Sequence, residues 1–144
     1  MTGDWNVERM LELGRRHAEI ETAGDLEGTM ATLIENPVYE FFPVGLRLEG
    51  GADVRRYYRH LMNDFIPNIT AGLIEEWVSP NSLAQEYEVV VDPDGAAEAH
   101  RVIGVLFVAE GTELLGGERI WGSERCLRLM LGDELFDELQ PVRP

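Results

Sequence analysis

The sequence has 144 residues, a length that suits one domain with a single sizeable core, and we expect one domain over residues 1–144. Its 44% hydrophobic and 27% charged residues are typical of a globular protein rather than a disordered one. The net charge of -15 argues against a nucleic-acid partner, because an acidic surface repels a phosphate backbone. No apolar run reaches the roughly 18 residues of a membrane span, and the first residues lack an export signal, so we expect a cytoplasmic protein without a membrane partner.

Cysteine and histidine usage excludes several kinds of site. Cys126 is the lone cysteine, so it forms no internal disulfide, and we expect it to be a packing residue. The three histidines, at positions 17, 60 and 100, have no familiar metal-ligand spacing. The sequence also lacks a glycine-rich phosphate loop and a G-x-S-x-G nucleophile motif. We therefore expect no metal and no cofactor.

Three segments of the first half carry helical patterns. Residues 6–22 place apolar or small side chains at helical spacing, and Asp25 is suited to cap a second short helix that ends before Asn36 and Pro37. Residues 51–65 carry the strongest pattern, and Pro67 ends that helix. The inward positions expected for this third helix are Val54, Tyr57, Tyr58, Leu61, Met62 and Phe65.

The remaining segments are typical of strands. The stretch VYEFFPVG at residues 38–45 predicts a short strand after the second helix, closed by a Pro-Val-Gly turn. We expect a closing helix from Ser123. Between the third helix and the closing one, turn residues separate four further predicted strands, at 71–79, 82–91, 100–109 and 115–122. This order predicts an α+β fold, in which a curved sheet wraps over the helices and leaves a cavity at its open end.

Several short motifs occur in an order that resembles a known family. They are AGDLEG, PVG, VRRYYRHL after a Gly-Gly pair, HRVIGVLFV and GGERIWGSERCL, spread over residues 8–131. In order and spacing they resemble the nuclear transport factor 2-like (NTF2-like) superfamily, and within it the SnoaL-like, polyketide-cyclase-like and ketosteroid-isomerase-like proteins. The resemblance implies a cone-shaped, cystatin-like fold, with a strongly curved, mixed and mostly antiparallel sheet enclosing a pocket. It also implies a homodimer formed through the sheet.

Ketosteroid isomerase chemistry uses an Asp base together with a Tyr and a protonated Asp that bind the enolate oxygen. The resemblance carries the position of the Tyr onto His17, the base onto Phe42 and the second oxygen-binding group onto Gly104. Two of the three groups are therefore missing. A 3-ketosteroid isomerase that uses the machinery of the family is not expected.

Strand alternation then predicts which neighbours share the pocket, because residues two apart lie on one face of a strand. The candidate catalytic residues are His17, Glu40, His100 and Arg119. The candidate ligand-binding residues are Phe42, Tyr57, Tyr58, Trp77, Gly104 and Trp121. An alternative register stays open: the chain from Asp25 to Pro43 is one residue longer than in the isomerases, and a slip of one residue would exchange Glu40 for Tyr39 and Phe41.

Each candidate also has a purely structural interpretation. His17 could be a core histidine, Glu40 could face water or pair with Arg47, and His100 could be an exposed strand end. Arg119 could form a surface ion pair, and the aromatic residues could belong to the core.

Two hypotheses follow for the function. The first is a cofactor-free isomerase, dehydratase, cyclase or epoxide-opening enzyme that acts on a small apolar molecule by acid-base proton transfer. The second is a non-catalytic module of the same fold that binds a ligand or forms a dimer.

Overall fold

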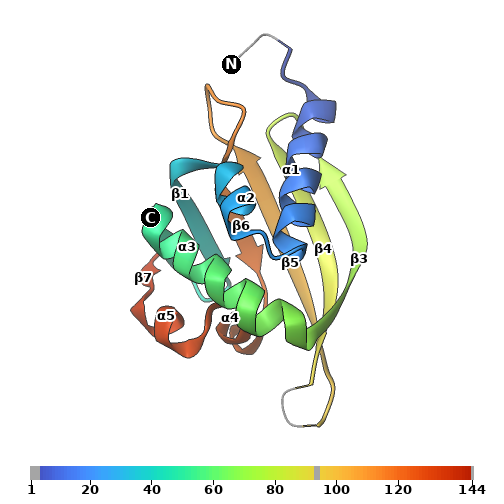
Figure 1. The fold of residues 1–144 in the computed structure, drawn as a ribbon, viewed down its shortest axis with the longest axis vertical. Coiled ribbons are helices and arrows are strands. Elements are labelled where there is room, and N and C mark those ends of the chain that lie inside the picture. Colours follow the sequence, from blue (N-terminus) through green and yellow to red (C-terminus); the bar gives the residue numbers. More distant parts are fainter. Residues whose placement is uncertain (1–3, 93–94, 144) are drawn as a thin grey trace.

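A computed structural model describes residues 4–92 and 95–143 (Figure 1). Its α-helices are α1 (Val7–Thr22), α2 (Leu26–Ala31), α3 (Gly51–His60), α4 (Glu124–Leu131) and α5 (Asp133–Glu138). Helix α3 continues through a π-helix, η1 (Leu61–Phe65), into a 3-10 helix, η2 (Ile66–Asn68). The strands are β1 (Leu33–Phe42), β2 (Leu46–Glu49), β3 (Ile69–Val78), β4 (Ser82–Val91), β5 (Glu98–Val108), β6 (Leu115–Trp121) and β7 (Gln140–Pro141).

Side chains cap the amino ends of three helices, and each capping residue is of a type that is favoured at this position. The side chain of Asn6 accepts a hydrogen bond from the Arg9 amide at the start of α1. Asp25 caps α2 by accepting from the Gly28 amide, as predicted, and Ser123 caps α4 by accepting from the Cys126 amide. Local sequence chemistry therefore sets where these helices begin.

The strands form one mixed sheet in the order β3-β4-β5-β6-β1-β2-β7. Every pairing is antiparallel except that of β1 with β6, which is parallel. Hence the first strand lies beside the last long strand, and residues near 40 lie next to residues near 119. The predicted α+β fold with a mixed, mostly antiparallel sheet is confirmed.

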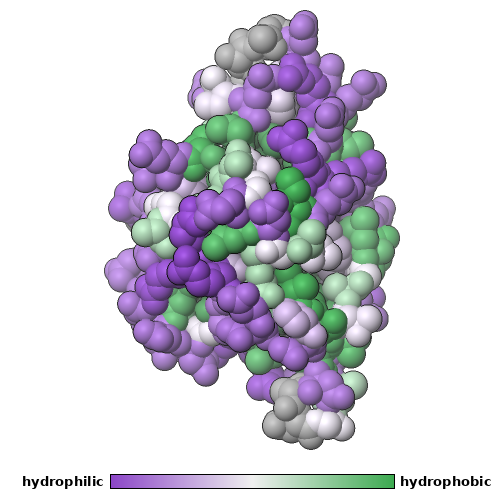
Figure 2. Space-filling view, in the orientation of Figure 1, coloured by the Kyte–Doolittle hydropathy of each residue, from purple (hydrophilic) through white to green (hydrophobic). Residues whose placement is uncertain are grey.

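Helices α1, α2 and α3 lie on one face of the curved sheet, and α4 and α5 lie near one end of it (Figure 1). The core lies between these helices and that face, and its fully buried side chains include Met10, Tyr39, Phe41, Tyr57, Tyr58, Leu83 and Leu127. Figure 2 shows hydrophilic side chains over most of the helix-covered side, with hydrophobic side chains at the surface between the end of α1 and α3. We call the helix-covered face of the sheet the inner face and the opposite one the outer face.

Some predicted element boundaries are wrong. The second helix ends at Ala31, and Leu33 already begins β1, which continues through Pro37 to Phe42. Strand β1 therefore begins earlier than the predicted start at Val38, because its pairing with β6 extends from Leu33 with Leu115. The short elements β2, α5 and β7 were not predicted. Strand β7 depends on pairing with the distant strand β2, whereas β2 pairs with β1 across a short turn. Among the described residues, no helix combines the length and the apolar character needed to cross a membrane.

Candidate functional site

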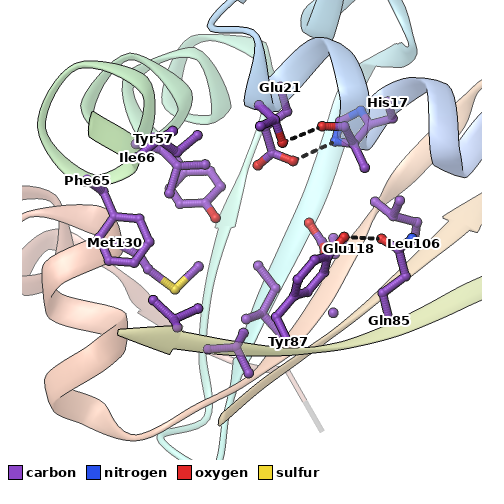
Figure 3. A pocket seen from close by; sticks show the side chains of 17 residues that line it. His17, Glu21, Tyr57, Phe65, Ile66, Gln85, Tyr87, Leu106, Glu118 and Met130 are labelled. Carbon is purple, nitrogen blue, oxygen red and sulfur yellow. Dashed lines mark hydrogen bonds and ion pairs between the residues drawn. The ribbon is translucent and has the colours of Figure 1, made fainter. Parts of the chain in front are cut away.

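A cavity of about 150 Å³ lies between the inner face of the sheet and the helices (Figure 3). Its walls come from α1, α3 with η1, the strands β4, β5 and β6, and α4. The apolar lining includes Leu61, Phe65, Val89, Val102, Leu106, Ile120 and Met130. The polar lining consists of His17, Glu21, Thr22, Tyr57, Gln85, Tyr87 and Glu118. A largely apolar hollow with a few polar groups directed into it is the usual form of a small-molecule site.

Glu118 places a carboxyl group in the middle of this cavity. Among the described residues it has no hydrogen-bond or ion-pair partner. Burial, and secondarily the nearby carboxyl of Glu21, raises its pKa well above the usual value, because a desolvated carboxylate without a cation is unfavourable. Burial therefore favours the protonated form of Glu118, which can donate a hydrogen bond.

Gly104 on β5 makes room for this carboxyl group. A Cβ atom at position 104 would lie 2.2 Å from Glu118 Oε2, closer than any real contact. Glu118 on β6 thus occupies the space into which a side chain from position 104 would extend. Position 104 is where the family resemblance expects a protonated acid, and here an acid from the neighbouring strand fills that space.

A bulge at Gly117 explains why Glu118 rather than Arg119 faces inward. Gly117 has φ +145°, and a Cβ atom there would lie 1.8 Å from the Val38 carbonyl oxygen, so only glycine fits. The pairing of β6 with β1 shifts between Leu33 and Val38, and its pairing with β5 shifts between Phe107 and Val108. Such an irregularity moves every later side chain to the other face.

Glu21 lies at the end of α1, beside the opening of the cavity. Its side chain is 22% exposed, and its Oε2 lies 3.9 Å from His17 Nε2. Burial raises the pKa of Glu21 to about 8, so this carboxyl group exchanges protons near neutral pH. Figure 3 shows Glu21 and Glu118 on opposite sides of the hollow. The site therefore combines two carboxyl groups and, among the described residues that line it, no arginine or lysine.

His17 belongs to a buried chain of hydrogen bonds. The Thr32 hydroxyl donates to the Thr29 carbonyl, so it accepts from His17 Nδ1 at 2.7 Å. His17 Nε2 then accepts from the Tyr58 hydroxyl at 2.9 Å, and Tyr58 in turn accepts from Tyr39. Burial lowers the pKa of His17 to about 4, in agreement with this neutral tautomer. His17 therefore supports the cavity wall and is not a free base.

Two tyrosines add hydroxyl groups to the cavity. Tyr57 is 1% exposed, and Figure 3 shows its hydroxyl directed into the hollow. Burial raises the pKa of Tyr57 well above 10, so Tyr57 is a hydrogen-bond donor at neutral pH. Tyr87 donates to Gln85 Oε1 at 3.0 Å. No group of three His, Cys, Asp or Glu side chains placed to hold a metal occurs in residues 4–92 and 95–143.

Five of the predicted pocket residues lie instead on the outer face, so their predicted orientation is wrong: Glu40, Phe42, Trp77, Arg119 and Trp121. Glu40 Oε1 accepts a hydrogen bond from Arg119 Nε at 3.2 Å. Phe42 stacks on Trp121, with the ring centroids 5.2 Å apart, and Trp77 is 48% exposed. Tyr39 and Phe41 face inward and are fully buried, so the alternative register is the one that the structure has.

The other predicted residues are divided between the cavity and its surroundings. Tyr57 and Gly104 line the cavity with His17, and Tyr58 lies behind His17 in the hydrogen-bond chain. His100 does not line the cavity, and the prediction that it faces a ligand there is wrong. It lies near the start of β5, where its Nε2 contacts Glu98 Oε1 at 3.2 Å. Its Nδ1 contacts the Ser123 hydroxyl at 3.3 Å, in the turn before α4, so this end of the strand lies outside the cavity.

Sequence reasoning missed the two carboxyl groups of the cavity. Glu21 lies four residues after His17 on the same helix, so helical spacing could have indicated that the two share a face. The signal for Glu118 was weaker, because the Gly-Gly pair before it only indicates that a bulge is possible. Gln85 and Tyr87 follow from alternation along β4 once the inner face is known.

Comparison with known proteins agrees with this architecture. No family model and no curated protein matches the sequence. Among solved structures, SalBIII, described as an epoxide hydrolase/cyclase-like enzyme in pyran ring formation in the polyether salinomycin, is 17% identical with a TM-score of 0.67, covering 82% of this chain and 93% of that one.

Two further structures are similar. An NTF2-like protein from Anabaena variabilis is 17% identical with a TM-score of 0.65, covering 86% of this chain and 95% of that one. A protein with a cystatin-like fold from Silicibacter pomeroyi is 14% identical with a TM-score of 0.65, covering 88% of this chain and 84% of that one. The chain therefore has the NTF2-like, cystatin-like fold that its motifs predicted.

Proposed function

We propose that the protein is a cofactor-free enzyme that binds a small, largely apolar molecule in the cavity and moves a proton on it. One observation carries the proposal: the Glu118 carboxyl points into an apolar hollow and has no partner among residues 4–92 and 95–143. Burying a carboxyl group without a partner costs free energy, so such groups are concentrated at functional sites. A purely structural core would have an apolar side chain at position 118.

Each polar group has a role in this proposal. Protonated Glu118 and the Tyr57 hydroxyl donate hydrogen bonds to one oxygen of the ligand. These two donors replace the donors that the resemblance led us to expect at positions 17 and 104. Glu21, whose pKa is about 8, serves as the base or acid that exchanges the proton. His17 keeps α1 in place through its hydrogen bonds and takes no proton itself.

The reaction follows from these roles. For a ketone, the Glu21 carboxylate takes a proton from the carbon next to the carbonyl group. The electron pair of that C–H bond moves to the carbonyl oxygen, where Glu118 and Tyr57 stabilise the negative charge. Protonated Glu21 then returns a proton to the substrate. Return to the same carbon exchanges the hydrogen atom of that carbon, and return to another carbon isomerises the substrate. The same pair of groups could open an epoxide that carries a hydroxyl group in the same molecule: Glu21 takes the proton of that hydroxyl, its oxygen bonds to one epoxide carbon, and Glu118 protonates the oxygen that leaves this carbon.

The cavity limits the substrate. A volume of about 150 Å³ resembles that of a cavity that holds one benzene-sized ring, below the several hundred Å³ of larger ligand sites. The cavity contains two carboxyl groups and, among the described residues that line it, no arginine or lysine, so binding of an anionic ligand is unfavourable. We therefore propose a neutral molecule with one ring and one oxygen that accepts hydrogen bonds. The description of SalBIII as epoxide hydrolase/cyclase-like supports acid-base chemistry on this fold, but not a particular substrate.

The outer face favours a second property, self-association. It exposes Trp77 by 48% and Trp121 by 40%, and it carries charges of both signs, including Glu40, Glu86, Arg101 and Arg119. A surface that carries both positive and negative side chains can form ion pairs with the same surface of a second copy related by a two-fold axis. We propose a homodimer through this face. Sedimentation analysis should show a dimer that Trp121→Ser weakens, whereas a monomer at every concentration would exclude it.

Deuterium exchange tests the proposed chemistry. Cyclohexanone in D₂O should lose the NMR signal of the protons next to its carbonyl group when the protein is added. Glu118→Leu and Glu21→Gln should each slow this exchange by about a hundredfold or more. Glu88→Gln is the matched control, because Glu88 is exposed on the outer face of β4. It should leave the exchange rate unchanged.

The outcomes separate the hypotheses. Binding of cyclohexanone that depends on Glu118, without exchange, would favour the non-catalytic ligand-binding module over the enzyme. Exchange that is equally fast in all three variants would place the chemistry outside this cavity. Native mass spectrometry of the purified protein adds a search for a bound natural ligand, whose loss on Glu118→Leu would identify its class.

A further inference from the structure

A second hollow lies next to the cavity on the same side of the sheet. Its volume is about 300 Å³, and its lining includes Asp64, Phe65, Asn68, Ile69, Val91 and Leu129. Phe65 is the residue that lines both this outer hollow and the inner cavity. Its side chain is 6% exposed, so the ring is packed between the two spaces.

The two spaces continue one another along β4. Gln85, Tyr87 and Val89 line the inner cavity, and Val91, the next residue on that face, lines the outer hollow. Helix α4 follows the same division, since Met130 lines the cavity and Leu129 the hollow. Without the Phe65 ring, a single longer groove would follow the inner face of β4.

An irregular helix holds Phe65 at this position. Residues Leu61–Phe65 form a π-helix, in which the Ile66 amide bonds to the Leu61 carbonyl, five residues earlier. The chain then changes to a 3-10 helix at Ile66. Leu61 and Phe65 both line the cavity as a result. Short π-helical turns often occur at functional sites, where they re-aim a side chain.

We propose that Phe65 sets the size limit of the ligand, by closing the inner cavity at the end that faces the outer hollow. This inference rests on the proposed binding of a small neutral molecule in the inner cavity. If Phe65 closes the cavity in this way, the ligand is a single ring without a long substituent directed toward Phe65. Replacing Phe65 by a small residue should join the two spaces and admit a ring with an alkyl tail.

Calorimetric titration with three neutral probes tests the proposal: phenol, para-ethylphenol and para-hexylphenol. The wild-type protein should bind para-hexylphenol at least about tenfold more weakly than para-ethylphenol, because a closed wall rejects the added methylenes. The Phe65→Ala variant should instead bind para-hexylphenol at least about tenfold more tightly than para-ethylphenol, since each buried methylene then adds affinity. Phe65→Leu, which keeps more of the buried volume, should change the preference in the same direction by a smaller factor.

Ile69→Trp supplies the matched control. Ile69 lines the outer hollow and not the cavity, so this change should leave the binding of all three phenols to the otherwise wild-type protein unaltered. Combined with Phe65→Ala, the tryptophan should fill the hollow and restore the preference for the short probe. That restoration would show that the tail of para-hexylphenol occupies the outer hollow.

The results distinguish this inference from the proposed function. An unchanged chain-length preference in both Phe65 variants would overturn the role of Phe65, even if cyclohexanone exchange depends on Glu118. A reversed preference in Phe65→Ala would support it, even if no exchange is observed. Equal affinity of the wild-type protein for the short and long probes would also overturn it, because the ring would then not limit the ligand.

Discussion

Glu118 and Glu40 lie on neighbouring strands, one position apart in the pairing of β6 with β1. Glu118 is paired with Tyr39 and faces the cavity, whereas Glu40 is paired with Arg119 and faces outward. Glu40 has a guanidinium partner at 3.2 Å, and Glu118 has no partner among the described residues. The same residue type therefore forms an ion pair on one face of the sheet and lies unpaired in an apolar cavity on the other.

This difference shows that the environment decides the chemistry of a carboxyl group. The carboxyl group of Glu40 is paired with Arg119 on the outer face, whereas burial in the apolar cavity favours the neutral form of Glu118. Only the neutral form can donate a hydrogen bond to a developing oxyanion. The four predictions below compare the two faces, beginning with the largest expected effect.

The largest effect concerns catalysis. Glu118→Leu should lower the rate of cyclohexanone exchange by about a hundredfold or more, because it removes a donor aimed at the ligand oxygen. Glu40→Leu should change the rate less than about twofold, since its carboxyl lies on the far side of the sheet. NMR exchange kinetics measure both rates. A large loss in Glu40→Leu and none in Glu118→Leu would restore the original sequence-based assignment.

The next effect separates activity from stability at Gly104. A Cβ atom in Gly104→Ala would displace the end of the Glu118 side chain, which can rotate away. We expect a loss of stability of about 1 kcal/mol together with a loss of exchange activity of about tenfold or more. Gly72→Ala on β3 is the matched control, because a Cβ atom there meets nothing within 4 Å. Denaturant titration and exchange kinetics should show full activity for Gly72→Ala and reduced activity for Gly104→Ala.

A third effect concerns pH. The pKa of Glu21 rises from 4.5 to about 8 on folding, and that of Glu118 also rises, so the folded state binds more protons than the unfolded state in this range. The free energy of unfolding should therefore fall as pH rises, by on the order of 2 kcal/mol between pH 6.5 and 8. His17, whose pKa falls from 6.5 to about 4, has the opposite effect, but only below pH 6.5.

Urea titrations at pH 6.5 and 8 measure this slope. The double variant Glu21→Gln with Glu118→Gln should lose most of it, since neither amide titrates. The same two changes at Glu40 and Glu88 should leave it intact, because both carboxylates are on the outer face. A wild-type protein that becomes more stable over this interval would contradict the assigned protonation of the cavity.

The smallest effect concerns the ion pair of the outer face. The Arg119 side chain is 57% exposed, and exposed ion pairs contribute little because water and salt screen them. At protein concentrations at which the protein is a monomer, Arg119→Ala should therefore lower the free energy of unfolding by less than about 1 kcal/mol. Thermal or urea unfolding at such a concentration measures the change. A loss of several kcal/mol in the monomer would contradict the surface character of this ion pair.

Much of the fold could be predicted because its signals are local. The helical spacing from Val54 to Phe65, the Asp25 and Ser123 caps and the turns between the later strands each depend on neighbouring residues, and all are present. Gly104 on β5, a predicted ligand-binding residue, does line the cavity. Tyr57 and His17 were placed at the cavity for the same reason, since helix periodicity determines which side faces the core.

The site could be predicted only in part, because the position of its central carboxyl group, Glu118, depends on strand register. Alternation says that Glu40 and Phe42 share a face, and that Arg119 and Trp121 share one, and both statements are true. It does not say which face is the inner one. That choice depends on the bulge at Gly117 and on the parallel pairing of β1 with β6, two segments that are almost eighty residues apart in the sequence.

The amino-acid sequence alone established the order of helices and strands, the family resemblance and the absence of the isomerase base at position 42. Those features follow from residue type and short-range spacing. Tertiary structure decided that Glu118 and Glu21 are the carboxyl groups of the cavity, and that Phe65 closes one end of it. Burial and the loss of ion-pair partners set the protonation of these groups, and both arise only when distant strands and helices pack together.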